Sequence, residues 1–296
     1  MKIIETLDVK PILKWVGGKR ELLPEIRRYY KDLEFNKFIE PFFGGGAVYL
    51  DIVSSFGQVQ IENSIINDIN VDLIELYRNI KIYPYDILEC CNTLEIDYKT
   101  HGYYHIRDRF NGITRDKQII EKYTGIMRSS ALIVLNRTCF NGLYRTNRGG
   151  LFNVPEGKYK NPRIINSENL FEFSKTLPNV ENIRNGNFDS MGDITKEDLV
   201  YFDPPYHPLN STSSFTDYSG AFGTKEQEQL KEYFKKLDDE GVYVLQSNSS
   251  SEFIKDLYSE FQIIELDCSR NINSNGKQRG KVKEYLIIGN TLSQKL

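Results

Sequence analysis

The stretch Leu199-Val200-Tyr201-Phe202-Asp203-Pro204-Pro205-Tyr206 decides the fold of this chain. Its first four residues form a short apolar run, which predicts a buried strand of a parallel sheet. The two prolines fix φ near about −65° and offer carbonyl acceptors without N–H groups. Ligands of α/β proteins bind beyond the carboxyl ends of such strands. The stretch therefore predicts a strand end that presents an acid, proline carbonyls and an aromatic ring to a planar, amine-bearing ligand such as a nucleobase.

Read alone, residues 203–206 favour a simpler interpretation, a polar turn between a strand and a helix. The first seventy residues supply the context that changes this. They predict an α/β unit with a glycine-rich turn at 41–46 and an acid at the end of its second strand, in the order helix 21–31, strand 37–40, helix 47–54 and strand 65–68. This order resembles the nucleotide-binding opening of a Rossmann-type sheet.

The rest of the chain predicts a helical insertion followed by a return to the sheet. Residues 71–136 are helical in pattern, and 136–162 have the composition of a structured loop. The later elements are expected as a helix at 225–238 begun by a capping box from Thr224, a strand at 242–245, a helix capped by 249–252 and a closing hairpin of 263–266 with 285–288. We expect one discontinuous domain of residues 1–77 and 181–296, with 78–180 inserted.

Composition favours a globular protein that faces a polyanion locally. The chain has 296 residues and a net charge of −3, and no apolar run reaches the roughly 18 residues of a membrane span. Its start lacks the pattern of a signal peptide, so we expect a soluble, cytoplasmic protein. Basic residues gather with aromatic residues, Asn and Gly in the ranges 10–20, 128–163 and 270–283. Such basic ranges in an acidic chain suit a DNA-facing cleft.

Cysteine and histidine give no pattern of metal ligands. The four cysteines form no CxxC pair. His101 and His105 stand at i and i+4 and are expected to face one way on a single helix. Without a third ligand or an HExxH motif, a zinc site is not expected there, and we predict no metal.

Five motifs now stand in order along the chain. They are Lys14-Trp15-Val16-Gly17-Gly18-Lys19-Arg20, Glu40-Pro41-Phe42-Phe43-Gly44-Gly45-Gly46, Asn67-Asp68-Ile69-Asn70, the segment 136–145 with 152–155, and Asp203-Pro204-Pro205-Tyr206. This set resembles the Dam and DpnII-type adenine-N6 DNA methyltransferases, the GATC-specific enzymes of the D12 class. The resemblance runs from about Pro11 to Gly289. It implies a Rossmann-like S-adenosylmethionine-dependent methyltransferase fold with a mainly helical target-recognition insertion at 78–180.

The resemblance implies S-adenosylmethionine as the methyl donor. Glycines in the turn at 44–46 allow close approach to a ligand, and the resemblance places the methionine part there. Asp68 is expected to accept hydrogen bonds from ribose hydroxyls, with the cap of the next helix as its simpler interpretation. The cofactor residues implied are Trp15, Gly17, Gly18, Lys19, Glu40, Phe42, Gly44, Gly46, Asp68, Phe188 and Asp203. Within this set Lys19 is expected to pair with the donor's carboxylate.

The catalytic residues implied are Asp203, Pro204, Pro205 and Tyr206. If Asp203 and the carbonyl of Pro204 accept the two N6 hydrogens, the nitrogen lone pair can turn toward the sulfonium methyl group. Transfer is then a direct in-line displacement, driven by positioning. Tyr206 is expected to stack on the adenine. The base must leave the duplex for this, which costs a few kcal/mol.

The insertion is expected to read the DNA. Arg145 has the fork geometry for guanine O6 and N7, and the resemblance assigns it one guanine of GATC and Lys14 the other. Leu143 and Pro155 suit thymine methyl groups, and Phe140 with Asn141 would fill the space that the adenine leaves. Phosphate contacts are assigned to Arg137, Arg148, Lys158 and Lys160. The simpler interpretations are core packing for the apolar residues and a solvated loop for the basic ones.

Some features depart from the family pattern, and other functions stay open. Cys139 stands where some relatives have Gly, residues 57–63 are an extra stretch, and 209–223 suit a mobile lid. Alternatives are a methyltransferase of the same fold acting on cytosine N4, RNA adenine or a protein glutamine, and a non-enzymatic DNA-binding relative. A nicotinamide-dependent oxidoreductase is disfavoured by the glycine pattern. We expect a monomer without membrane association, either a solitary Dam-like enzyme or the modification partner of a restriction endonuclease.

Overall fold

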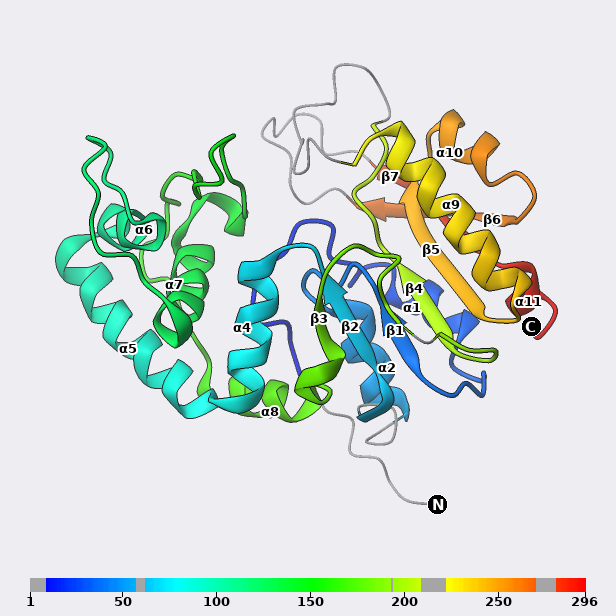
Figure 1. The fold of residues 1–296 in the computed structure, drawn as a ribbon, viewed down its shortest axis with the longest axis horizontal. Coiled ribbons are helices and arrows are strands. Elements are labelled where there is room, and N and C mark those ends of the chain that lie inside the picture. The colour runs from blue at the N-terminus through cyan, green and yellow to red at the C-terminus, as the bar shows by residue number, and fades with distance from the viewer. Residues whose placement is uncertain (1–8, 57–61, 193, 209–221, 270–280) are drawn as a thin grey trace. The chain divides into compact units, whose positions relative to one another are not determined.

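The structure, a computed structural model, describes residues 9–56, 62–192, 194–208, 222–269 and 281–296 (Figure 1). The chain packs into two compact units. The first comprises residues 1–18, 44–54 and 70–185, and the second comprises 19–43, 55–69 and 186–296. These units are defined by packing. The predicted division into a catalytic domain and a recognition insertion is one of function and stays a prediction.

The strands form one seven-stranded sheet in the order β3-β2-β1-β4-β5-β7-β6. Their bounds are β1 Phe38–Glu40, β2 Ile65–Asp68, β3 Ile183–Asn185, β4 Leu199–Phe202, β5 Tyr243–Ser249, β6 Gln262–Ser269 and β7 Lys281–Ile288. β1 pairs in parallel with both β2 and β4, and β4 pairs in parallel with β5, whereas β7 is antiparallel to both β5 and β6. A mostly parallel sheet with a closing antiparallel hairpin confirms the predicted Rossmann-like α/β fold.

The second unit has its core on the parallel strands. Val200, Phe202 and Val244 are fully buried, and the amphipathic helix α9 (Thr224–Asp239) lies along β5 in Figure 1 and buries Leu230 and Phe234 against them. The other helical elements of this unit are α1 Leu23–Ile26, η1 Arg27–Tyr29, α10 Glu252–Leu257 and α11 Asn290–Ser293. Helices cover these parallel strands, which explains why the strands appear in the sequence as continuous apolar runs.

The first unit is built around α7 (Gly125–Thr138), whose stretch Ala131–Leu135 is buried on every side. A helix that is apolar all round belongs in a core, and α7 packs against α4, α5 and α6. Figure 1 shows these helices gathered in the cyan-to-green part of the chain. The helical elements are α4 Val71–Ile82, α5 Pro84–His101, α6 Tyr103–Asn111, η2 Phe140–Gly142, α8 Ser167–Thr176 and η3 Val180–Asn182, with α2 Ala47–Phe56 crossing into the second unit.

Several local predictions need correction. The helix expected at 21–31 is only the short α1 followed by a 3₁₀ turn, since Pro24 stands at its start and Tyr30 leaves the helical region. The cap of α9 is Gly223 rather than Thr224, because Glu226 Oε2 accepts the Gly223 N–H at 2.7 Å. Among the described residues, no helix is long and apolar enough to cross a membrane.

Candidate active site

Three acidic residues mark the carboxyl ends of adjacent parallel strands in the second unit. Glu40 ends β1, Asp68 ends β2, and Asp203 directly follows β4. β1 lies between β2 and β4 and runs parallel to both. Carboxyl ends of parallel strands meet at one edge of a sheet, so these carboxyl groups share the edge where α/β proteins bind ligands. Glu40 is buried at 3% exposure.

Asp203 is bound to Lys19. The Nζ of Lys19 lies 2.9 Å from Oδ1 of Asp203, with the two side chains 4% and 20% exposed. The same ammonium lies 4.7 Å from the centroid of the Tyr206 ring, a cation–π distance. Burial raises the pKa of Asp203 to about 6, Lys19 lowers it and Glu284 adds to the rise. Lys19 therefore keeps a buried carboxylate largely ionised, and an ionised carboxylate only accepts hydrogen bonds.

Glu284, on β7, contacts the other end of the motif. The hydroxyl of Tyr206 donates a hydrogen bond of 2.6 Å to Oε2 of Glu284. Burial, together with the negative charges of Asp203 and Glu284, raises the pKa of Tyr206 well above its ordinary value, so this hydroxyl remains a donor. Glu284 was not among the predicted site residues, because it stands 78 residues from its partner. The pairing of β5 with β7 brings it to the site, because Glu284 lies opposite Ser249.

The backbone of the motif is held by two buried amides. Gln227, on α9, donates from Nε2 to the Pro205 carbonyl at 2.8 Å. Asn248, on β5, donates from Nδ2 to Oε1 of Gln227 at 3.0 Å, and its Oδ1 accepts the His207 N–H at 3.4 Å. Both amide side chains are fully buried. A satisfied buried network of this kind fixes geometry, so the turn after β4 is rigid where it follows the strand.

An aromatic cluster lies beside this edge. Phe42 stacks on Phe188 with ring centroids 5.6 Å apart, and both rings contact Phe222 edge-on. Phe188 is 5% exposed and packs into the core with Phe202. The structure thus brings together two residues predicted for the cofactor, and their role toward an adenine ring stays a prediction.

In the first unit, Trp15 closes over the glycine turn. Gly44 has φ +49°, and a Cβ there would lie 2.7 Å from Cδ1 of Trp15. Only glycine fits both the backbone conformation and this close approach. Trp15 also stacks on Tyr144, with ring centroids 5.7 Å apart. The Tyr144 hydroxyl donates to Asp72 Oδ2 at 3.1 Å, so the orientation of the single Trp is fixed from two sides.

Comparison with known proteins agrees with this arrangement of motifs. Residues 15–272 match the family described as D12 class N6 adenine-specific DNA methyltransferase. The chain belongs to this family. It is 38% identical to the Type II methyltransferase M.MjaIII of Methanocaldococcus jannaschii, covering 95% of this chain and 99% of that protein. It is 36% identical to the Type II methyltransferase M1.LlaDCHI of Lactococcus lactis, with 95% of each covered. It is 32% identical to the DNA adenine methylase of Escherichia coli K12, covering 94% and 95%.

As a D12 class DNA methyltransferase, the chain acts on adenine in DNA, and the family implies S-adenosylmethionine as the methyl donor. In the second unit, the acceptor-only carboxylates at the strand ends suit the hydroxyl and amine groups of such a donor. In the first unit, a Cβ at Gly44 would clash with the Trp15 ring, so only glycine lets the turn lie this close to it. Gly46 shares the turn with φ +67°, and Gly17 has φ +83°. Gly17 and Gly18 are exposed.

The segment predicted to read DNA in this family member is tied to Lys14. Asn136 accepts the Lys14 N–H at 2.8 Å and donates to the carbonyls of Lys14 and Gly142. Gly142 has φ +65°, and a Cβ there would lie 2.6 Å from the Cβ of Lys14. Lys14 Nζ stands 4.7 Å above the Tyr159 ring. The structure therefore joins the first motif to the predicted recognition segment within the first unit.

The other predicted DNA-contacting residues lie mostly on the surface. Phe140 is 44% exposed, and Asn141 beside it adopts φ 55°. Arg145 is exposed, with Nε donating to Oδ1 of Asn153 at 2.7 Å. Arg137 differs, because it is partly buried and donates to the carbonyl of Ile12. Leu143 is partly buried, and the remaining exposed residues are Arg148, Pro155, Lys158 and Lys160.

Cys139 is a packing residue. It is fully buried, and burial raises the pKa of its thiol to about 12. Three predictions concern segments that lie largely outside the described residues: the extra stretch 57–63, the lid 209–223 and the basic range 270–283.

Proposed function

We propose that this D12 class enzyme transfers the methyl group of S-adenosylmethionine to N6 of adenine in double-stranded GATC, with the adenine flipped out of the helix. The observation that carries this proposal is Asp203, ionised and bound to Lys19 at the end of β4. Around it, Gln227 binds the Pro205 carbonyl and Glu284 binds the Tyr206 hydroxyl. The names of the relatives support a DNA adenine substrate.

The proposed mechanism relies on two hydrogen-bond acceptors, the Asp203 carboxylate and the Pro204 carbonyl. Asp203 and the Pro204 carbonyl each accept one N6 hydrogen, so the nitrogen lone pair leaves conjugation with the ring. When bound, S-adenosylmethionine supplies an electrophilic methyl group on sulfonium. In such a transfer N6 would bond to the methyl carbon as the carbon–sulfur bond broke, with the thioether as the leaving group. The N6 proton passes to Asp203 or to water. Fixed acceptors lower the barrier because they need no reorganisation during transfer.

Tyr206 is proposed to hold the base by stacking. The hydrogen bond from its hydroxyl to Glu284 restrains the ring, and Lys19 packs against the ring face. Asp68 is proposed to bind the ribose of the donor. Trp15, Gly17, Gly18, Lys19, Glu40, Phe42, Gly44, Gly46 and Phe188 are proposed for the rest of the donor.

Sequence reading is proposed for the segment that follows α7. Arg145 and Lys14 each read one guanine, and Leu143 and Pro155 contact thymine methyl groups. Phe140 and Asn141 enter the stack in place of the flipped adenine; the exposure of the Phe140 ring supports this over core packing. The fixed orientation of Arg145 by Asn153 supports a bidentate contact. Arg137, Arg148, Lys158 and Lys160 are proposed for phosphates, and of these Arg137 has the least exposed side chain.

The central test is a map of methylated adenines in DNA from cells that express the chain. We expect N6-methyladenine in GATC, and methylation confined to another sequence, to cytosine or to RNA would refute the GATC assignment. Arg145→Ala should reduce discrimination at one guanine by about 1–3 kcal/mol, measured as the ratio of rates on GATC and single-base variants. Asn147→Ala, a neighbouring exposed change, is the control.

A second test separates catalysis from binding. Asp203→Ala should abolish methyl transfer while DNA binding persists. A variant that turns over near the normal rate would remove Asp203 from the mechanism. Because relatives of this family include Type II methyltransferases, we propose that the enzyme is the modification partner of a restriction endonuclease or a solitary Dam-like enzyme, acting as a monomer.

A further inference from the structure

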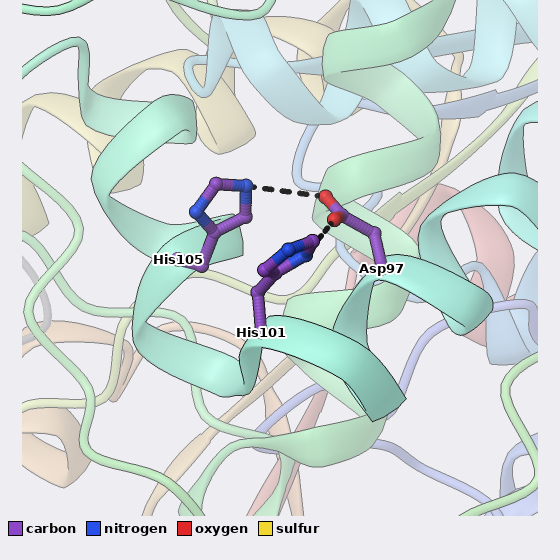
Figure 2. A group of neighbouring side chains, drawn as sticks. All are labelled: Asp97, His101 and His105. Carbon is purple, nitrogen blue, oxygen red and sulfur yellow. Dashed lines mark hydrogen bonds and ion pairs between the residues drawn. The ribbon is translucent and has the colours of Figure 1, made fainter.

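Three side chains with metal-ligating atoms meet at the corner between α5 and α6, in the first unit. Figure 2 shows Asp97 pointing between the rings of His101 and His105. Nδ1 of His101 lies 2.6 Å from Oδ1 of Asp97, and Nε2 of His105 lies 3.3 Å from Oδ2. One ligand atom from each residue falls within 4.8 Å of those of the other two. The methyl-transfer mechanism uses none of these residues.

The backbone makes this meeting possible through a turn that the spacing of the two histidines does not reveal. The two histidines are not on one helix. α5 ends at His101, Gly102 turns the chain with φ 84°, and α6 begins at Tyr103. Asp97 and His101 share a face of α5 because they stand four residues apart, and the turn brings His105 to that face. Asp97 is the third ligand whose absence argued against a zinc site.

Neighbouring groups hold the carboxylate in place. The hydroxyl of Tyr123 donates to Oδ2 of Asp97 at 3.4 Å. The Arg109 guanidinium stacks over the Tyr123 ring at 4.8 Å and forms an ion pair of 2.9 Å with Glu121. Outer contacts that orient a ligating carboxylate are a general feature of metal sites. A cavity of about 530 Å³ adjoins the cluster, lined by Asp97, His101, Arg109 and Tyr123 among others.

The charges around the cluster leave room for a cation. Arg109 and Lys122 line the cavity, and their positive charges disfavour a bound cation. Arg109 is already paired with Glu121, which also lines the cavity. Asp97 supplies the negative charge closest to the two imidazoles. The side chains of Asp97, His101 and His105 are 24%, 56% and 37% exposed, so a cation can reach them and the rings can rotate.

We propose that Asp97, His101 and His105 bind a divalent transition-metal cation, with Zn²⁺ the best match. Two imidazoles and one carboxylate are ligands that Zn²⁺ accepts, with a fourth position open to water. Bonds of about 2.0–2.1 Å in a tetrahedron put ligand atoms about 3.3 Å apart. The observed limit of 4.8 Å therefore requires a contraction of at most about 1.5 Å, within reach of ring rotation. The cation fastens the last turn of α5 to the first turn of α6.

The test measures Zn²⁺ binding directly. Protein freed of any histidine tag is stripped with a chelator, dialysed and titrated with ZnCl₂ by calorimetry. Wild type should bind one equivalent. Asp97→Asn, His101→Gln and His105→Gln should each weaken binding by at least about tenfold, the lower end of losses seen on changing even outer contacts. The matched controls are His207→Gln, which removes the only other histidine of the sequence, and Glu95→Gln on the same helix. Both should bind as wild type does.

A substitution could unfold the corner between α5 and α6, which circular dichroism would detect. A second measurement therefore uses the wild-type protein alone. Zn²⁺ should protect His101 and His105, but not His207, from acylation by diethyl pyrocarbonate, as read by peptide mass spectrometry. Equal labelling with and without Zn²⁺ would overturn the proposal. So would a wild type without saturable binding, or cluster variants that bind as tightly as the controls.

Discussion

Replacing Lys19 by Met should shift the pH dependence of methyl transfer to higher pH. The substitution keeps the length of the side chain and removes the charge 2.9 Å from Asp203 Oδ1. Two unit charges at this distance attract by about 6 kcal/mol at an effective dielectric constant of about 20. This corresponds to about 4 pKa units and is an upper bound. A fifth of the Asp203 side chain is exposed, which screens the pair, so a shift of about 1–3 units is expected.

The expected profile follows from the pKa of Asp203. Wild-type activity should fall as the pH drops through about 6, where Asp203 takes up a proton. In Lys19→Met the midpoint should lie between about 7 and 9. With a midpoint near 8, about one tenth of the carboxyl groups are ionised at pH 7, a tenfold loss of rate that returns above pH 9.

The assay is the single-turnover rate on a GATC duplex from pH 5 to 9.5, at saturating S-adenosylmethionine. Saturation separates the two roles of Lys19: loss of a donor contact raises KM for the donor, and loss of the Asp203 partner moves the midpoint. Arg20→Met removes a charge from the exposed next residue and should leave the midpoint in place. A Lys19→Met midpoint at or below that of wild type would refute the reasoning.

The same ionisation has a consequence for stability. The folded-state pKa of Asp203, raised by burial from 3.8 to about 6, means that the folded chain holds this proton more tightly than the unfolded chain. The contribution of Asp203 to the free energy of unfolding should therefore fall by about 3 kcal/mol as the pH rises from about 4 through 6. In Lys19→Met the fall should extend to higher pH, which urea unfolding at several pH values measures.

Three further variants test other contacts. Glu284→Gln keeps an acceptor for Tyr206 but removes a charge that raises the pKa of Asp203, so its pH–rate midpoint should move below about 6, opposite to Lys19→Met; a rise contradicts this. Gly44→Ala should lower the free energy of unfolding by more than about 1–2 kcal/mol and change Trp15 fluorescence. The control Gly125→Ala has φ +52° and open space around its Cβ, so it should lose only the stability that backbone strain costs. Asp72→Ala leaves Arg128 without its 2.7 Å partner and should cost about 3–5 kcal/mol in urea unfolding; a loss under 1 kcal/mol would refute this.

Much of the sheet was predictable because several of its strands have a clear local sequence pattern. Residues 199–202 are a short apolar run before an acid, and residues 65–68 begin with two isoleucines and end at an acid. The structure has strands there with the same bounds. The cap at Ser251 was also readable, since its side chain accepts the Ile254 N–H. In contrast, β3 has only three residues with a single buried one, Ile183, too few to produce a periodic pattern.

The corner of His101 and His105 was misread for a physical reason. A spacing of four residues is ambiguous when a glycine falls inside it, because glycine accepts a positive φ that ends a helix. Gly102 has φ 84° and donates its N–H to Tyr98 as the closing bond of α5. Asp97, four residues before His101, was visible in the sequence. Its proximity to His105 depends on the turn and not on spacing.

Asn248, which binds Gln227 behind the turn that follows β4, lies in a part of β5 beyond the predicted strand. The predicted strand ends at Leu245, whereas β5 continues to Ser249 with every residue buried. Buried polar groups generally need partners, and these side chains have specific ones: Gln246 Oε1 accepts from Tyr258, Ser247 binds Tyr201 and Asn248 binds Gln227. A central strand whose buried polar side chains are held by such partners places hydrogen-bonding groups beside the edge where the ligand binds. Four polar residues directly after an apolar strand signal are therefore better read as the strand continuing beneath a site than as its end.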